Sequence, residues 1–222
     1  MTKITREIVE QGIDASIGAA PAPTVEQVTE FAQSTIPYHF AAIAIEPFYV
    51  PYVAPMYHAA GKKLCALCNY PLGGMTFEDK YAQAKQAIAD GADELDCGID
   101  ISAFMSGNYK KVEEDFKPML ELADGRIIKW LYFCSLMTED QQLKCVEIAV
   151  KLGVPFLKTN PGYGFSTTLD NVRLVKKNFG DAIKIMTSGG VRTTEDAIAM
   201  MEAGASRIAT SSAFKIMEGF DQ

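Results

Sequence analysis

One lysine of this chain stands where an amine can act as a nucleophile. Lys158 ends the apolar run Gly153-Val-Pro-Phe-Leu-Lys158, which has the pattern of a buried strand. At the end of such a strand the side chain faces a cavity, where loss of hydration penalises the ammonium form and favours the neutral amine. A neutral lysine amine forms imines (Schiff bases) with carbonyl substrates. The alternative is a strand-end lysine that extends its ammonium group into solvent and does no chemistry.

Two neighbouring segments near the C-terminus could bind an anion. Gly189 and Gly190 lie between a predicted strand and a helix start at Thr193. Glycines let backbone N–H groups approach an anion, and a helix N-terminus adds partial positive charge. One strand later, Thr210-Ser211-Ser212 repeats the arrangement with hydroxyls, as is typical of the phosphate site that α/β barrels form after strands seven and eight. Arg192 is either a phosphate ligand or a solvated charge at the helix start.

Charged residues interrupt three apolar segments. Asp96 lies in the run 94–99 and Lys129 in the run 126–133. Buried charges are costly unless they are paired, so we expect these two side chains to pair in the protein interior. Such a pair is structural, and it can at the same time position a water for proton transfer. Asp14 is a third candidate for an interior charge.

The cysteines indicate neither a metal site nor redox chemistry. Cys65 and Cys68 match C-x-x-C but lie within a predicted strand, where residues three apart point to opposite faces. Five cysteines and two histidines, without a second such pair, support no zinc site. The odd number of cysteines also does not fit a disulfide framework.

Eight apolar segments alternate with helical patterns, and these elements must position the residues above. The predicted strands are 12–16, 40–46, 63–69, 93–99, 127–133, 155–159, 183–187 and 206–210. Three predicted helices end in a glycine that leads directly into a strand, at Gly91, Gly153 and Gly204. Capping boxes open helices at 24–27 and 138–141, and a related pattern does so at 193–196. The order predicts one domain over residues 1–222, a (β/α)8 TIM barrel, with a doubly wound open sheet as the alternative.

Composition narrows the classes of partner. A chain of 222 residues with 48% hydrophobic residues can bury one large core. It has no apolar stretch of about 18 residues, so we expect no membrane span. Residues 1–9 lack the pattern of a secretory signal, so we expect a cytoplasmic protein. A net charge of −7 opposes binding to nucleic acid or anionic lipid, so we expect a small-molecule substrate and leave a homo-oligomer open.

Several motifs in order give the chain a family resemblance. They are Asn69-Tyr-Pro-Leu-Gly73, Gly91-Ala-Asp-Glu-Leu-Asp96, Ser106-Gly-Asn-Tyr109, Phe156-Leu-Lys-Thr159, Ser188-Gly-Gly-Val-Arg-Thr193 and Thr210-Ser-Ser212. On these motifs the chain resembles the 2-deoxy-D-ribose-5-phosphate aldolase family from about residue 12 to residue 212. The resemblance implies a (β/α)8 barrel and a class I aldolase without cofactor or metal. Members cleave deoxyribose 5-phosphate to acetaldehyde and glyceraldehyde 3-phosphate.

The resemblance also implies roles for individual residues. Lys158 would form the Schiff base, and Asp96 would shuttle protons through an ordered water. Lys129 and Asp14 would be supporting charges in the barrel. Residues implied to bind the phosphate or the rest of the substrate are Thr159, Gly162, Gly189, Gly190, Arg192, Ser211 and Ser212.

One departure from the family concerns the pKa of the nucleophile. The family has a second active-site lysine where this chain has Met186, and its charge helps to depress the pKa of the first. An ordinary lysine is neutral in only about one molecule in 2,500 at pH 7, so half-neutrality requires about 4–5 kcal/mol of differential stabilisation. Desolvation alone can supply such a shift. Lys184, one layer deeper on the same strand face, is a candidate to replace the missing charge.

Further departures concern the substrate. The segment after Lys158 reads Thr159-Asn160-Pro161-Gly162, and Ala44, Phe133, Glu46 and Asp100 also differ from the residues expected of the family. The main hypothesis is an imine-forming aldolase acting on a phosphorylated sugar. The alternatives are an aldolase-like barrel with another aldehyde or ketone substrate, and a non-catalytic relative that binds phosphosugars.

Overall fold

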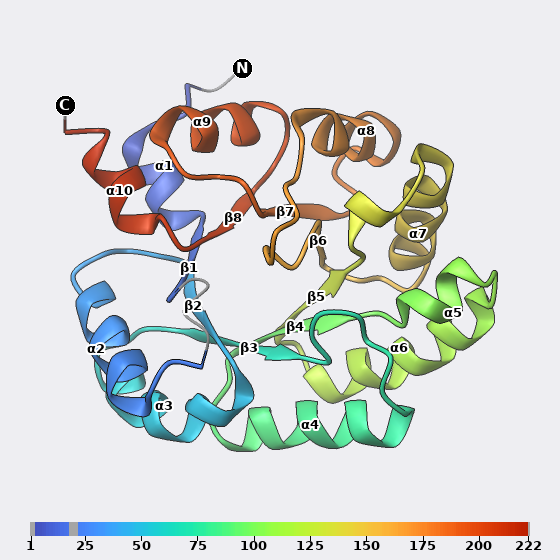
Figure 1. The fold of residues 1–222 in the computed structure, drawn as a ribbon, viewed down its shortest axis with the longest axis horizontal. Helices are drawn as coiled ribbons and strands as arrows, with labels where there is room; N and C mark the ends of the chain where they lie inside the picture. The colour runs from blue at the N-terminus through green and yellow to red at the C-terminus, as the bar shows by residue number, and fades with distance from the viewer. Residues whose placement is uncertain (1–2, 18–21, 222) are drawn as a thin grey trace.

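The eight predicted strands close into a barrel. The computed structural model describes residues 3–17 and 22–221, and its parallel strands follow chain order around the barrel (Figure 1). Asp14 of β1 pairs with Ala42 of β2 on one side and with Ala209 of β8 on the other. The (β/α)8 barrel is therefore confirmed, and the open sheet is excluded. Met1 and Thr2, the first residues of the segment 1–9 that lacks a secretory-signal pattern, lie outside the described residues.

The strands differ from their predicted bounds by at most two residues. They are β1 Ile13–Ser16, β2 Ala42–Ile45, β3 Leu64–Cys68, β4 Glu94–Gly98, β5 Ile127–Leu131, β6 Phe156–Lys158, β7 Lys184–Ser188 and β8 Arg207–Thr210. All run in the same direction, so their carboxyl ends meet at one face of the barrel. Enzymes with this fold place their active sites at that face.

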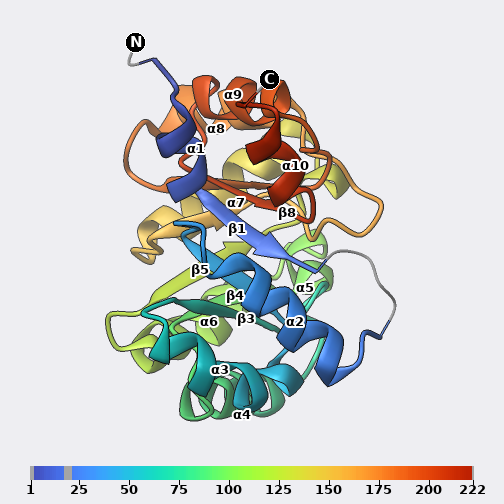
Figure 2. The same cartoon turned by 90° about the vertical axis from the view of Figure 1, so that its left-hand side faces the viewer.

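Helices surround the barrel (Figures 1 and 2). They are α1 Arg6–Gln11, α2 Val25–Thr35, α3 Val50–Ala59, α4 Phe77–Ala89, α5 Ile101–Met105, α6 Tyr109–Ala123, α7 Glu139–Lys151, α8 Leu169–Phe179, α9 Thr194–Glu202 and α10 Ala213–Glu218, with short 3₁₀ turns η1 Pro47–Tyr49 and η2 Cys134–Leu136. None of the helices in the described part of the chain is long and apolar enough to cross a membrane.

The predicted helix caps are present. Thr24, Thr138 and Thr193 each accept a hydrogen bond from the backbone three residues later, and the side chain at that position bonds back to the cap. A further capping box, formed by Thr168 and Asn171, opens α8. The sequence pattern missed it because asparagine takes the place of the usual Glu or Gln.

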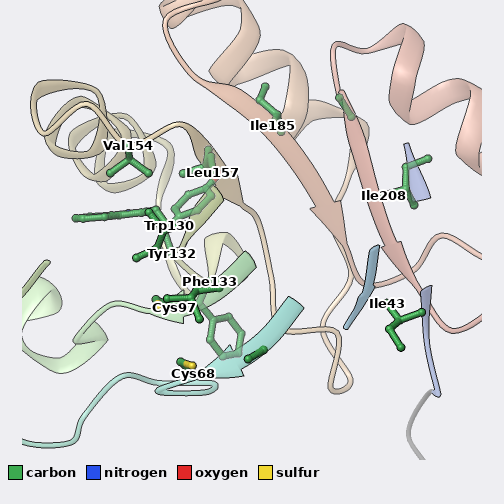
Figure 3. Close-up of a cluster of buried hydrophobic side chains, with 14 of the residues drawn as sticks. Ile43, Cys68, Cys97, Trp130, Tyr132, Phe133, Val154, Leu157, Ile185 and Ile208 are labelled. Atoms are coloured by element: carbon green, nitrogen blue, oxygen red, sulfur yellow. The ribbon is translucent and has the colours of Figure 1, made fainter. Parts of the chain in front are cut away.

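Side chains alternate between the two faces of each strand. The large apolar residues, among them Ile43, Trp130 and Leu157, point outward and pack under the helices (Figure 3). Ala42, Ala44 and Cys65 form a separate cluster of small side chains with Leu67. This is the period-two pattern of strands covered on both sides, and small residues leave space inside the barrel beside β2 and β3.

Cys65 and Cys68 point to opposite faces, as predicted. Cys65 Sγ contacts the charged residues inside the barrel, whereas Cys68 belongs to the outer core (Figure 3). All five cysteines are buried and free.

Candidate active site

Four charged residues from four strands meet inside the barrel. Asp14 of β1, Asp96 of β4, Lys129 of β5 and Lys158 of β6 are all buried. The Lys158 ammonium contacts Asp96 Oδ2 directly. Lys129 Nζ lies 2.8 Å from Asp96 Oδ1 and 3.0 Å from Asp14 Oδ2. The structure thus brings these side chains together, and the expected pairing of Asp96 with Lys129 is present between neighbouring strands.

Two further residues complete this interior network. Glu94 Oε2 lies 3.0 Å from Lys129 Nζ. Arg207 donates hydrogen bonds of 2.5 and 3.0 Å to Glu94, and its Nη1 lies 3.3 Å from Asp14 Oδ1. The network, defined as Asp14, Glu94, Asp96, Lys129, Lys158 and Arg207, therefore balances three carboxylates with three cations. Sequence reasoning missed Glu94 and Arg207, although each is a charge inside an apolar strand.

Lys129 is the centre of the network. Burial acts to lower the pKa of Lys129, but the carboxylates of Asp14, Asp96 and Glu94 together raise it well above its ordinary value. For Asp96, burial acts to raise the pKa, but Lys129 and Lys158 together bring it far below its ordinary value. Both groups therefore stay charged in the folded protein.

Replacing Lys129 by methionine is expected to destabilise the fold by about 3–5 kcal/mol, because three buried carboxylates lose their shared partner. Denaturant unfolding measures the change. Lys110, an exposed lysine paired with Glu114 on α6, is the matched control and should show little effect as Lys110→Met. Equal stability of the two variants would contradict the interior network.

The ionisation of Lys158 differs from the sequence-based expectation. Desolvation is the largest single effect and lowers its pKa, as expected. The carboxylate of Asp96 outweighs it through its charge and its hydrogen bond, so the pKa is raised above its ordinary value. Met186, fully buried and in register with Lys158 on β7, contributes no charge. The ligand-free site therefore holds an ammonium ion, and the expectation of a neutral amine was wrong.

Lys184 does not replace the missing lysine. It is the first residue of β7, its side chain is exposed, and its ammonium lies 5.4 Å from the centroid of the Phe156 ring. The expectation that Lys184 supplies charge from below was wrong because β7 begins at this residue, so the side chain emerges at the open amino end of the barrel. The cation found on the neighbouring strand β8 is Arg207.

A cavity of about 500 Å³ opens at the carboxyl ends of the strands. Its wall contains Lys158 and five of the residues expected at the phosphate, namely Gly162, Gly189, Gly190, Arg192 and Ser211. Gly189 has a φ of +87°, and a Cβ there would lie 2.0 Å from the Phe165 carbonyl oxygen, so only glycine fits. The nucleophile and the expected anion site thus face one cavity.

The remaining two residues expected at the substrate have structural contacts. Thr159 is buried, with its Oγ1 2.6 Å from Thr167 Oγ1, and it accepts a hydrogen bond from Ser188 N. Ser212 directly precedes α10, and its N–H donates to Thr210 Oγ1 at 2.9 Å. Thr159 therefore fixes the loop beside Lys158.

Phe133, one of the departures from the family, is buried in the hydrophobic core, and those at 44, 46, 100, 160 and 161 fall into two groups. Ala44, Glu46 and Pro161 line the cavity. Asp100 and Asn160 instead support the backbone: Asp100 accepts a 2.8 Å hydrogen bond from Ala103 N at the start of α5, and Asn160 Oδ1 accepts a 3.3 Å hydrogen bond from Ser135 N. Of the two unexpected acids, only Glu46 therefore faces the substrate space.

A family model described as dihydroorotate dehydrogenase matches residues 165–220. This part of the barrel runs from the loop before α8 to α10 and includes Gly189 and Gly190. The match covers less than half of the chain and establishes no membership.

Curated relatives match nearly the whole chain. A deoxyribose-phosphate aldolase of Streptococcus mutans is 34% identical over 212 residues, covering 95% of this chain and 96% of the relative. The enzyme of the same name from Carboxydothermus hydrogenoformans is 33% identical over 216 residues, covering 95% and 94%.

Solved structures agree with these relatives. QR15, described as an aldolase, superposes with a TM-score of 0.90 at 34% identity and covers 96% of this chain and 95% of its own. The deoxyribose phosphate aldolase from Aeropyrum pernix, described as a unique tetramer, has a TM-score of 0.91 at 25% identity and covers 99% and 94%.

Proposed function

The chain belongs to the deoxyribose-phosphate aldolase family, and from this membership we propose that it cleaves or forms the bond between acetaldehyde and glyceraldehyde 3-phosphate, or a closely related phosphosugar. The observation that carries the proposal is the position of Lys158. Its amine contacts Asp96 and lines the same cavity as Gly189, Gly190 and Arg192. One substrate can then place its carbonyl at the amine and its phosphate at the glycines.

The chemistry follows from these positions. The Lys158 amine adds to C1 of the open-chain sugar and water leaves, which gives a protonated imine. The C2–C3 bond breaks, its electrons form an enamine with the imine as electron sink, and the C3 hydroxyl proton passes through water to Asp96. Protonation of the enamine and hydrolysis release acetaldehyde. Lys129 would keep Asp96 in position through their 2.8 Å contact.

The raised pKa of Lys158 predicts an unusual pH dependence. Attack requires the neutral amine, and a pKa above the ordinary value keeps the ammonium form dominant through the neutral range. We therefore expect kcat/KM to rise about tenfold per pH unit between roughly pH 6 and 9, without a plateau. A plateau that begins below about pH 8 would show that the amine is already neutral there, against this account.

Restoring a cation beside Lys158 provides the internal check for this pH profile. In Met186→Lys the added charge should lower the pKa of Lys158 by about 1–3 units and raise activity at neutral pH at least about tenfold. Met105→Lys, on the exposed face of α5, is the matched control and should leave the profile unchanged.

The proposal is tested by incubating the protein with deoxyribose 5-phosphate and measuring acetaldehyde release, with the melting temperature recorded in parallel. We expect cleavage together with thermal stabilisation by the substrate. Stabilisation without cleavage, and without an imine that borohydride can trap, would identify a phosphosugar-binding protein instead. An imine with acetaldehyde but no cleavage of this sugar would indicate another substrate.

A second candidate, an aldolase with a different phosphosugar or acceptor, is supported by Glu46. This acid is exposed and lines the cavity, where its charge disfavours a second anionic group on the substrate. Comparing deoxyribose 5-phosphate with other monophosphorylated sugars in the same cleavage assay distinguishes the candidates.

The proposal also covers the cellular compartment, the domain organisation and the partners of the enzyme. We place it in the cytoplasm as a single catalytic domain, without nucleic acid or membrane partners. Self-association is supported only by the tetramer described for the Aeropyrum pernix relative.

A further inference from the structure

We propose that Tyr70 is a positioning residue of this site. Its ring packs over the Lys158 amine. Its hydroxyl donates a hydrogen bond, the tie, to the loop that carries Gly162 and holds this loop near the amine. The inference rests on the proposed function for its kinetic consequences, although the tie itself can be measured without turnover. Tyr70 belongs to the motif Asn69–Gly73, to which neither the imine chemistry nor the anion site assigns a role.

Tyr70 joins two walls of the cavity. Its ring centroid lies 5.1 Å from Lys158 Nζ. Its hydroxyl donates a 2.6 Å hydrogen bond to the carbonyl oxygen of Pro161, which precedes Gly162 in the loop between β6 and α8. Both Tyr70 and this loop line the cavity. Burial raises the pKa of Tyr70 to about 12, so the phenol keeps its proton and remains a donor at neutral pH.

The segment that carries Tyr70 is fixed to the strand that carries Asp96. A Cβ on Gly98, at the end of β4, would lie 2.4 Å from the Asn69 carbonyl oxygen, so the two backbones are in close contact. Gly73 N donates to the same oxygen at 3.0 Å, and Ile101 N donates to Leu72 O at 3.2 Å. Tyr70 is therefore held in a constant position relative to Asp96 and the amine.

The loop after β6 gains a support from this tyrosine. Thr159 fixes its start to Ser188, and Thr167 N fixes its end to the Gly189 carbonyl at 3.0 Å. Between these ends, the hydrogen bond from Tyr70 holds Pro161, next to Gly162. A phosphate bound at Gly162 and Gly189 therefore meets a loop whose position relative to Lys158 is already set, which lowers the cost of ordering it.

The ring has a separate effect on the amine. An aromatic face attracts a cation, and the imine that borohydride reduces carries a positive charge on this nitrogen. The ring also excludes water, which would hydrolyse the imine, from this nitrogen. The hydroxyl thus acts on phosphate binding and the ring on imine formation. Two substitutions, Tyr70→Phe and Tyr70→Leu, separate these effects.

Tyr70→Phe removes the tie and keeps the ring. We expect KM for deoxyribose 5-phosphate to rise about 3- to 10-fold, the net worth of one hydrogen bond, with kcat within about twofold. The rate of imine trapping by acetaldehyde and borohydride should be unchanged, because acetaldehyde has no phosphate. In the ligand-free protein, amide hydrogen exchange in residues 159–168 should become faster.

Tyr70→Leu removes the ring as well. We expect the trapping rate to fall about tenfold or more, while Tyr70→Phe keeps the wild-type rate and so rescues this step. Tyr81→Phe on α4, outside the cavity lining, is the control for loss of a phenol hydroxyl. Circular dichroism and thermal melting establish that each variant is folded.

The outcomes separate this inference from the proposed function. A wild type without aldolase activity would overturn the function, while faster exchange in Tyr70→Phe would still support the tie. Exchange in residues 159–168 equal to that of Tyr81→Phe would overturn the tie, whatever the activity. Trapping by Tyr70→Leu at the wild-type rate would overturn the role of the ring.

Discussion

Replacing Lys158 by methionine is expected to lower turnover at least about 10⁴-fold, because the covalent route through the imine is closed. The variant should still fold, since methionine fills a similar volume and Asp96 keeps Lys129 at 2.8 Å. Turnover is measured by acetaldehyde release under saturating deoxyribose 5-phosphate.

Lys158→Arg is the matched control for charge. A guanidinium group retains the positive partner of Asp96 but does not form an imine under these conditions. Both variants should still be stabilised thermally by phosphosugar, because the glycines and Arg192 are unchanged. Turnover by Lys158→Arg within about tenfold of the wild type would show that the lysine acts only through its charge.

Replacing Asp96 by asparagine is expected to lower turnover by about 10²–10⁴-fold, because the site loses the group that moves protons. The same change should lower the pKa of Lys158, since the Asp96 carboxylate is the main group that raises it. Imine trapping at neutral pH should therefore be as fast as in the wild type or faster, while turnover falls.

Unchanged or faster imine trapping together with lower turnover in Asp96→Asn distinguishes two roles of Asp96, proton transfer and charge balance. If Asp96 were only a counter-ion, both trapping and turnover would rise in Asp96→Asn. Asp93→Asn, just before β4 and paired with His58 at 2.9 Å, is the control for an Asp-to-Asn change outside the cavity lining. Loss of a buried carboxylate between two lysines should also destabilise Asp96→Asn by about 3–5 kcal/mol, so kinetics are compared below its melting temperature.

Periodicity and local signals were enough to predict the barrel. The apolar segments predicted which residues are strands, and glycine and threonine at the helix ends predicted several of the turns between them. The same segments predicted that Asp14, Asp96, Lys129 and Lys158 lie inside one barrel. A charged side chain on a strand that is covered on both sides cannot reach solvent and must find a partner in the interior.

Properties that depend on neighbouring strands could not be predicted in this way. The contacts of Arg207 with Glu94 and Asp14 follow from the closure of the barrel, which joins residues distant in sequence. The raised pKa of Lys158 depends on a direct contact with Asp96 that no spacing reveals. Lys184 was expected inside the barrel, but it is the first residue of β7, and its side chain is exposed.

The central claim is that the Lys158 amine captures an aldehyde. Acetaldehyde and borohydride are added to the folded protein at about pH 8.5, where the neutral form of a lysine amine is more abundant, and the digested protein is analysed by mass spectrometry. The account predicts one ethyl group on the peptide that carries Lys158, and none at that position in Lys158→Arg. An unmodified Lys158 in protein that binds phosphosugar would contradict it.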